Sequence, residues 1–181
     1  MGADAVTPGS VVRVAVLIGA VVVLQGTLGL ELRIAGAHPE VGWVLPICAG
    51  LVAGPEAGAV VGFVTGLATD LLVPTPFGLS ALVACLLGFA AGRLATTLSD
   101  PGPAVVPLAA AAGSAVAAML YAVLGAVLGQ DQMLRVDLGA VVGVVGVTNA
   151  VVALPANRAL RWALGRAAPR RRRSAAPGGR W

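Results

Sequence analysis

Long apolar runs, separated by short clusters of proline, glycine and charged residues, constrain this chain more than any other feature. Six runs can be read, and they cover about residues 11–30, 41–53, 57–73, 78–98, 104–128 and 138–154. Hydrophobic residues make up 58% of the 181 positions and charged residues only 11%. A soluble domain of this size could not bury so much apolar surface. The pattern therefore predicts an all-α integral membrane protein with about six transmembrane helices in one bundle.

The second run is too short for a full transmembrane span. A full crossing needs about 20 apolar residues, with a range of roughly 17 to 25. Residues 41–53 fall short of that length, and Pro46 interrupts them. They form either a short tilted span or a re-entrant hairpin that surrounding protein shelters from lipid. We expect residues 1–160 to form the bundle and residues 161–181 to form a disordered cytoplasmic tail.

Arginine predicts the orientation of the spans. The chain has twelve basic residues, all of them arginine, and eight lie at or after Arg158. The positive-inside rule places that end in the cytoplasm, and six spans then place the N-terminus there too. The expected protein is a multi-pass protein of the inner (plasma) membrane.

The tail contains four consecutive arginines, which are Arg170, Arg171, Arg172 and Arg173. Contact with anionic lipid, at about 1 kcal/mol per arginine, accounts for them without a further role. Docking to a cytoplasmic protein is the alternative. Nucleic-acid binding is not expected, because no aromatic residues or folded module accompany the charge.

A glycine series occupies the second and third runs, at positions 50, 54, 58, 62 and 66, and Asp70 continues its spacing of four. Residues four apart share one face of a helix, and small residues on that face let two helix backbones approach closely inside a membrane. We expect Gly58, Gly62 and Gly66 to pack against another helix. That helix belongs either to this chain or to a partner. The pattern continues in later runs at Gly88, Gly92, Gly125 and Gly129.

Asp70 and Gly78 flank the turn after the third run. Asp70 is either a carboxylate wetted at a helix end or a buried acceptor that fixes the next loop or a partner, since ionisable groups at membrane depth are costly. Arg93 is expected near the opposite membrane face, where Glu56 is the better match for it. Arg33 or Arg135 could reach Asp70 from outside.

No pattern predicts catalysis, a metal site or a cofactor. The chain lacks a P-loop, an HExxH or GxSxG motif, and paired carboxylates on one run. Cys48 and Cys85 lie in apolar runs without a neighbouring histidine, which is typical of small buried hydrophobic residues. His38 is the single histidine. These residues are too few for a metal centre.

Two segments resemble a known family. The sequence GFVTGLATDLL at 62–72, followed by PFGLSAL at 76–82 and by a glycine–aromatic step at Gly88-Phe89, resembles the bacterial rod-shape-determining protein MreD family. The resemblance implies a non-enzymatic membrane scaffold of the cell-wall elongation machinery. It implies work with MreC and, through it, with MreB, RodZ, the RodA glycosyltransferase and its partner transpeptidase. The implied fold is like the substrate-binding component of energy-coupling-factor transporters.

Two other functions stay open. A substrate-binding component of a vitamin importer would need a polar pocket among the outer halves of the helices. Apart from Asn149, Asn157 and a few threonines, the runs offer few groups that could orient a polar ligand. A membrane protein with some other role is the third alternative. Self-association of the chain into a homo-oligomer is compatible with each of them.

Overall fold

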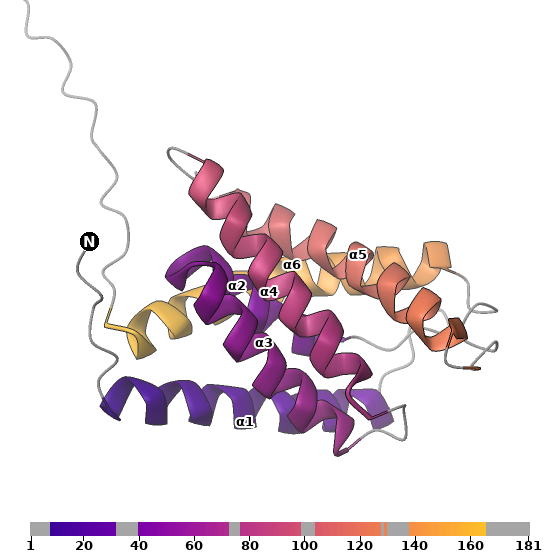
Figure 1. Cartoon of the computed structure of the whole chain (residues 1–181), viewed down its shortest axis with the longest axis horizontal. Helices are drawn as coiled ribbons and strands as arrows, with labels where there is room; N and C mark the ends of the chain where they lie inside the picture. The colour runs from indigo at the N-terminus through magenta and orange to yellow at the C-terminus, as the bar shows by residue number, and fades with distance from the viewer. Residues whose placement is uncertain are drawn as a thin grey trace, which may run out of the picture.

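The computed structural model describes residues 8–31, 40–72, 77–98, 104–127, 129 and 138–165. These residues form six α-helices and one 3-10 turn, and no strand occurs among them (Figure 1). The elements are α1 (Pro8–Glu31), η1 (Val41–Trp43), α2 (Val44–Ala53), α3 (Pro55–Asp70), α4 (Leu79–Thr97), α5 (Val105–Val127) and α6 (Leu138–Ala163). The predicted all-α class is confirmed.

A single residue, Gly54, separates α2 from α3, and a proline begins α3. Gly54 has φ +95° and donates its backbone N–H to the carbonyl of Gly50, which ends α2. Pro55 is the first residue of α3. Proline fits that position because its fixed φ suits a helix and its missing N–H would have had no partner there.

The last helix differs from the prediction. The apolar run was expected to end at about Leu154, but α6 continues through Pro155 to Ala163. Leu160 and Ala163 are fully buried, so one face of the helix stays apolar after arginines enter the sequence. The expected boundary at residue 160 therefore falls inside α6. Residues 166–181, with the four consecutive arginines, lie outside the described residues.

The centre of the fold is α2. Eight of its ten residues are buried, and it packs against α3, α4, α5 and α6. In Figure 1 it lies between the α3–α4 pair and α6. Ten residues of helix span about 15 Å. This short segment is covered by protein, as a sheltered segment in a membrane must be.

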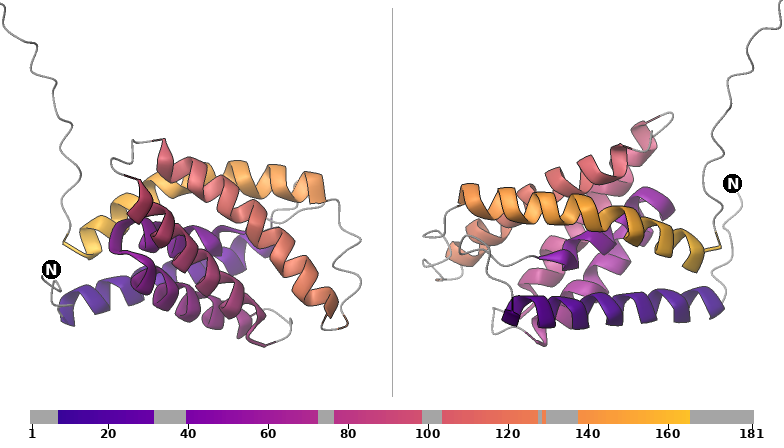
Figure 2. Two further views of the ribbon diagram at one scale, coloured as in Figure 1. Left: turned by 45° about the horizontal axis from the view of Figure 1, so that its top comes forward. Right: turned by 180° about the vertical axis from the view of Figure 1, so that it is seen from behind.

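Longer helices surround α2. α3 pairs with α4 and α5 pairs with α6, and α1 runs along one side of the bundle (Figure 2). Three described segments are long and apolar enough to cross a membrane, namely Pro8–Thr27, Leu79–Thr97 and Val105–Val127. Large apolar side chains on their outer faces, such as Val16, Leu86 and Leu108, are exposed. These features are those of a membrane protein.

Candidate functional site

Backbone contact joins α3 to α4. A methyl group placed on Gly66 would overlap the carbonyl oxygen of Ser80, one on Gly62 would overlap that of Ala84, and one on Gly58 would overlap that of Gly88. Each step of four along α3 thus meets a step of four, in the opposite direction, along α4. A side chain on the three α3 glycines would push the two helices apart.

The glycine face of α3 therefore packs against a helix of the same chain. Gly50 of α2 also lies against α4, where an added methyl would overlap the Gly88 carbonyl. Gly54 differs, because it forms the turn and has no atoms near its missing side chain. Gly129 also makes no such contact and has φ +84° outside the helices, so it does not extend the packing pattern. The packing partner that the sequence left open is α4 of the same chain.

Asp70 is a buried acceptor at the junction of the two helices. It is 5% exposed. Its Oδ2 accepts hydrogen bonds from the backbone N–H groups of Gly78 at 2.9 Å and Ala81 at 3.3 Å. Its Oδ1 accepts one from the N–H of Ser80 at 3.2 Å. The alternative of a water-exposed carboxylate does not hold.

These bonds fix the beginning of α4. The first N–H groups of a helix have no partner within it, and negative charge is favourable at that end. Gly78 precedes the helix with φ +93°, in the left-handed region that favours glycine. Asp70 therefore caps the following helix from the end of the preceding one. Arg33 and Arg135, the cations proposed for Asp70, lie outside the described residues, as do residues 73–76.

Glu56, the residue matched to Arg93, lies on the segment that packs near it, since a methyl on Gly92 would overlap the backbone of Pro55. Glu56 is in the first turn of α3, and both side chains are exposed. Within the described ranges these two residues form no salt bridge. Exposed pairs contribute little, because water solvates each charge nearly as well.

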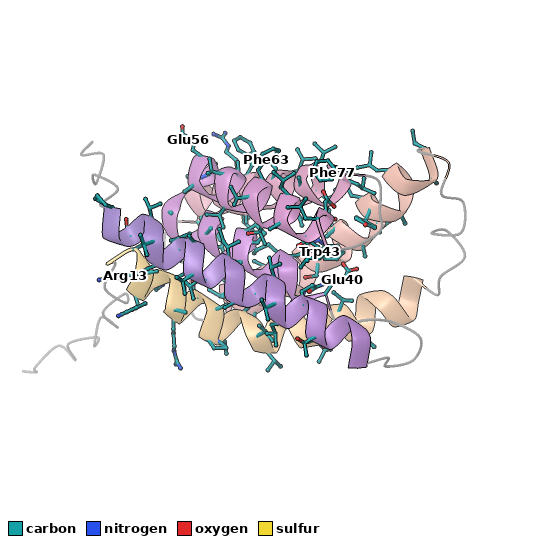
Figure 3. The ribbon with its side chains drawn as sticks, turned by 90° about the horizontal axis from the view of Figure 1, so that it is seen from below. Arg13, Glu40, Trp43, Glu56, Phe63 and Phe77 are labelled. Carbon is teal, nitrogen blue, oxygen red and sulfur yellow. The ribbon has the colours of Figure 1, made fainter. Side chains whose placement is uncertain are left out.

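The motif of residues 62–89, which contains most of the glycine contacts and Asp70, also has a face that points out of the bundle. The three phenylalanines of the chain are Phe63, Phe77 and Phe89, and they are 50%, 69% and 45% exposed. Phe63 and Phe77 lie on the same side of the molecule in Figure 3. The glycines of the motif thus point into the bundle, while its aromatic rings point out.

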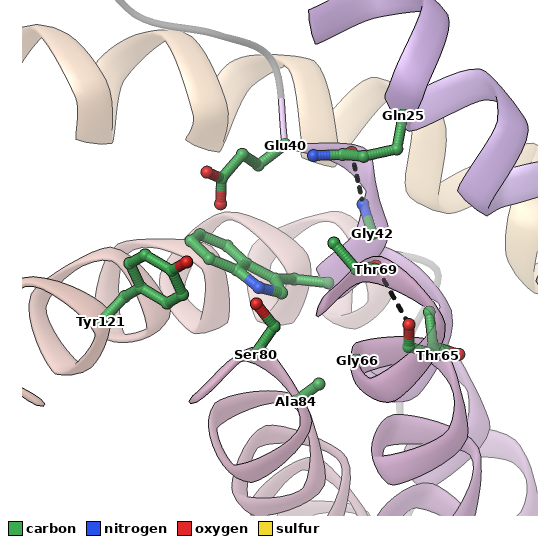
Figure 4. Close-up of a pocket in the computed structure, with 10 residues that line it drawn as sticks. Gln25, Glu40, Gly42, Thr65, Gly66, Thr69, Ser80, Ala84 and Tyr121 are labelled. Atoms are coloured by element: carbon green, nitrogen blue, oxygen red, sulfur yellow. Dashed lines mark hydrogen bonds between the residues drawn. The ribbon is translucent and has the colours of Figure 1, made fainter. Parts of the chain in front are cut away.

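A small cavity of about 50 Å³ lies beside the motif. Its walls come from α1, the segment before α2, α3, α4 and α5, and the lining residues are Gln25, Glu40, Gly42, Trp43, Thr65, Gly66, Thr69, Ser80, Ala84 and Tyr121 (Figure 4). No sequence pattern predicted this site. The polar residues of the runs are few, as expected, but the fold brings several of them together.

Glu40 is held at the cavity by its backbone. Its carbonyl accepts a hydrogen bond of 2.8 Å from Nδ2 of Asn149, which also donates to Oγ of Ser114 at 2.6 Å. Asn149 is fully buried, and its Oδ1 has no hydrogen-bond partner among the described residues. Burial raises the pKa of the Glu40 carboxyl to about 7, because a low-dielectric surrounding disfavours its charged form.

The described residues contain no cluster of three metal-ligating side chains. Cys48 is buried and Cys85 is partly buried, and both thiols are free. His38 lies outside the described residues.

No protein-family model, curated protein or solved structure matches this chain.

Proposed function

We propose that this protein is a non-enzymatic membrane scaffold of the bacterial cell-wall elongation machinery, which maintains cell shape together with a MreC-like membrane protein. The proposal starts from the resemblance of residues 62–89 to the MreD family. The structural observation that supports it is that some of these residues pack inside the bundle while others point out of it. Gly62, Gly66 and Asp70 serve the fold, while Phe63 and Phe89 point outward.

The outward rings need an explanation that the fold does not supply. Lipid tails accept any apolar side chain, so a lipid-facing surface does not require aromatic residues. Aromatic residues are enriched where proteins bind one another. We assign the outer face of the α3–α4 pair to the membrane helix of the MreC-like partner. The partner would in turn link the chain to MreB, RodZ, RodA and a transpeptidase.

In this proposal the protein crosses the inner membrane several times with both termini in the cytoplasm. Arg13 near the start of α1 lies over the Trp162 ring at the end of α6, 5.0 Å from its centroid. This contact supports an arrangement with both chain ends on one side. The Asp70 turn and the cavity then face outward, and Arg158 and Arg161 face the cytoplasm. α2 reaches into the bundle without facing lipid.

The test is recovery of the partner from membranes. The double variant Phe63→Ala/Phe89→Ala should lose most of a co-expressed MreC-like protein in a pull-down, since aromatic hot spots cost about 2 kcal/mol or more each, roughly 30-fold. The matched control is Leu108→Ala on α5, which is 67% exposed and lies outside the proposed interface. If the double variant and the control recover equal amounts of the MreC-like protein, the proposed interface is wrong. If the wild-type protein does not recover the MreC-like protein, the proposed scaffold function is wrong.

The cavity favours a second candidate, the substrate-binding component of a vitamin importer. It is polar and lies at the end expected to face outward. Its volume of about 50 Å³ is well below the roughly 300 Å³ at which ligand pockets begin. An importer would have to open this site widely, so we rank the scaffold first. Vitamin uptake that depends on the chain in a host lacking its own importer would reverse the order.

A further inference from the structure

The cavity contains a carboxyl group that no described residue pairs with. Glu40 supplies the only charged side chain among the lining residues, and among described residues no hydrogen bond or ion pair reaches its carboxyl group. Figure 4 shows that group in the same cavity as the Tyr121 ring and the Ser80 hydroxyl. Asp70 belongs to the same region, but both of its oxygens accept backbone N–H groups. In the part of the cavity that the structure describes, the Glu40 carboxyl is therefore the acidic group that a ligand could pair with.

Two threonines of the wall can act only as acceptors toward a ligand. The Thr65 hydroxyl donates its hydrogen to the carbonyl of Val61 at 2.7 Å, and the Thr69 hydroxyl donates to that of Thr65 at 3.0 Å. A hydroxyl has one hydrogen and two lone pairs, so both threonines can only accept from a ligand. A ligand that contacts these two hydroxyls must donate the hydrogen bonds.

Two aromatic rings complete the wall. The Trp43 and Tyr121 rings lie with their centroids 6.4 Å apart and are inclined by 51°. Trp43 is 7% exposed, so its ring is largely removed from solvent. The faces of such rings attract cations, most strongly for tryptophan and where water is excluded. A carboxylate beside aromatic rings is a usual surrounding for an organic ammonium ion.

Size limits the ligand. One water needs about 10–15 Å³ of such space, so a cavity of about 50 Å³ holds a few waters or a group of similar size. A primary ammonium with one or two carbons fits, whereas a quaternary trimethylammonium is too bulky.

We propose that this cavity is a binding site for a primary alkylammonium group, with Glu40 as its counter-ion and Trp43, Thr65 and Thr69 as the walls that orient it. This function is separate from the scaffold role and does not depend on it. The ammonium belongs either to a free small amine or to the ethanolamine headgroup of a lipid, and both present the same three N–H donors.

Trp43 provides a direct readout. The chain has three tryptophans, at 43, 162 and 181, so the full-length protein with Trp162→Phe and Trp181→Phe reports from the cavity alone. In phosphatidylcholine nanodiscs, methylammonium chloride should give a saturable change in Trp43 fluorescence at constant ionic strength. Methanol, its neutral counterpart, and sodium chloride should give none. A missing response, or equal saturation with sodium or methanol, overturns the proposal.

Glu40→Gln keeps the size of the side chain and removes its charge. It should weaken methylammonium binding roughly tenfold or more, because a charge-assisted hydrogen bond is lost. Glu56→Gln, on an exposed residue of α3, is the matched control and should bind as wild type does. Unchanged affinity in a folded Glu40→Gln variant overturns the assignment.

A pH series on the unaltered cavity keeps the test decisive if Glu40→Gln does not fold. Among the described residues, the polar groups that line the cavity with Glu40 are those of Gln25 of α1, Trp43 of η1, Thr65 and Thr69 of α3, Ser80 of α4 and Tyr121 of α5. With the carboxyl titrating near pH 7, its ionised fraction rises roughly tenfold between pH 6 and pH 8, while an alkylammonium stays protonated. Affinity should rise by about the same factor. A flat profile contradicts the proposal.

The same reporter distinguishes the two sources of the ammonium. A Trp43 response in nanodiscs that contain phosphatidylethanolamine, without added amine and lost in Glu40→Gln, identifies the lipid headgroup. A response to methylammonium alone identifies a free amine.

Discussion

The Asp70 carboxylate and the Gly78 backbone N–H are joined by a hydrogen bond of 2.9 Å that crosses the turn between α3 and α4. The two partners are eight positions apart in the sequence. The bond, with those to Ser80 and Ala81, ties the end of one helix to the start of the next. The Asp70 hydrogen bonds and the glycine contacts together fix the position of α4 relative to α3.

Replacement of Asp70 should destabilise the protein in a graded way. Asp70→Ala leaves three backbone N–H groups without their acceptor, and each unsatisfied buried group costs about 1–3 kcal/mol. Asp70→Asn keeps one oxygen, which can still accept from Gly78 and Ala81, but places an amide NH2 near the Ser80 N–H. We expect the midpoint of denaturant unfolding in micelles to fall in the order wild type, Asn, Ala. Identical unfolding midpoints for the Asn and Ala variants would show that the hydrogen bonds of Asp70 do not contribute to stability.

The same two variants test whether the turn contributes to partner binding. Recovery of the MreC-like protein, normalised to the amount of each folded variant, should be lower for Asp70→Ala than for Asp70→Asn. Normal recovery with Asp70→Ala would restrict Asp70 to a role in folding.

Gly62→Ala should disturb the contact between α3 and α4. The added methyl would overlap the Ala84 carbonyl, and overpacking typically costs about 1–3 kcal/mol. Gly19→Ala is the matched control, since Gly19 lies in α1 with no atom within 4 Å of the added carbon. Thermal stability in detergent should fall for Gly62→Ala and stay unchanged for Gly19→Ala. Equal melting of the two variants would contradict close packing at Gly62.

Asn149 should be sensitive to truncation. Asn149→Ala removes the donor to the Glu40 carbonyl and the donor to Ser114, at an expected cost of about 1–3 kcal/mol. Thr96→Ala is the control, because its exposed hydroxyl bonds only to the Arg93 carbonyl in its own helix. Unfolding in urea should separate the two variants clearly. The same Asn149→Ala variant should also weaken methylammonium binding, since the backbone of Glu40 loses its anchor.

Reporter fusions test the proposed topology. Fusions at Leu30, Pro76 and Gln130 should be external, and a fusion after Trp181 should be cytoplasmic, because arginine is concentrated at that end. An external C-terminal fusion would overturn the orientation. A cytoplasmic Pro76 would instead show that α2 and α3 enter and leave the membrane on the same side.

The helices could be predicted from sequence because proline and glycine separate the apolar runs. The predicted run 78–98 corresponds to α4 at Leu79–Thr97, and the run 104–128 to α5 at Val105–Val127. The prediction was poorer in α6, where the apolar run ends but a buried face at Leu160 and Ala163 continues. Hydrophobicity averaged over all sides of a helix does not detect one buried stripe.

The contacts of the site could be predicted only in part. Glycine at every fourth residue indicated close packing, but the opposing row on α4 includes Ser80 and Ala84, which are too common to mark a contact. The cavity could not be foreseen, because Gln25, Glu40 and Tyr121 come from segments far apart in the chain. Only tertiary structure places an isolated glutamate beside an aromatic pair.

The central position of α2 has a consequence for biogenesis. Four helices that cover it, α3 to α6, follow it in the chain, so they leave the ribosome later. Until those helices are made, the apolar surface of α2 that they cover has no partner from them. A nascent chain that stops before α6 would carry an uncovered core segment and become a target for membrane proteases. We therefore expect a chain truncated before α6 to be degraded faster than the full-length protein.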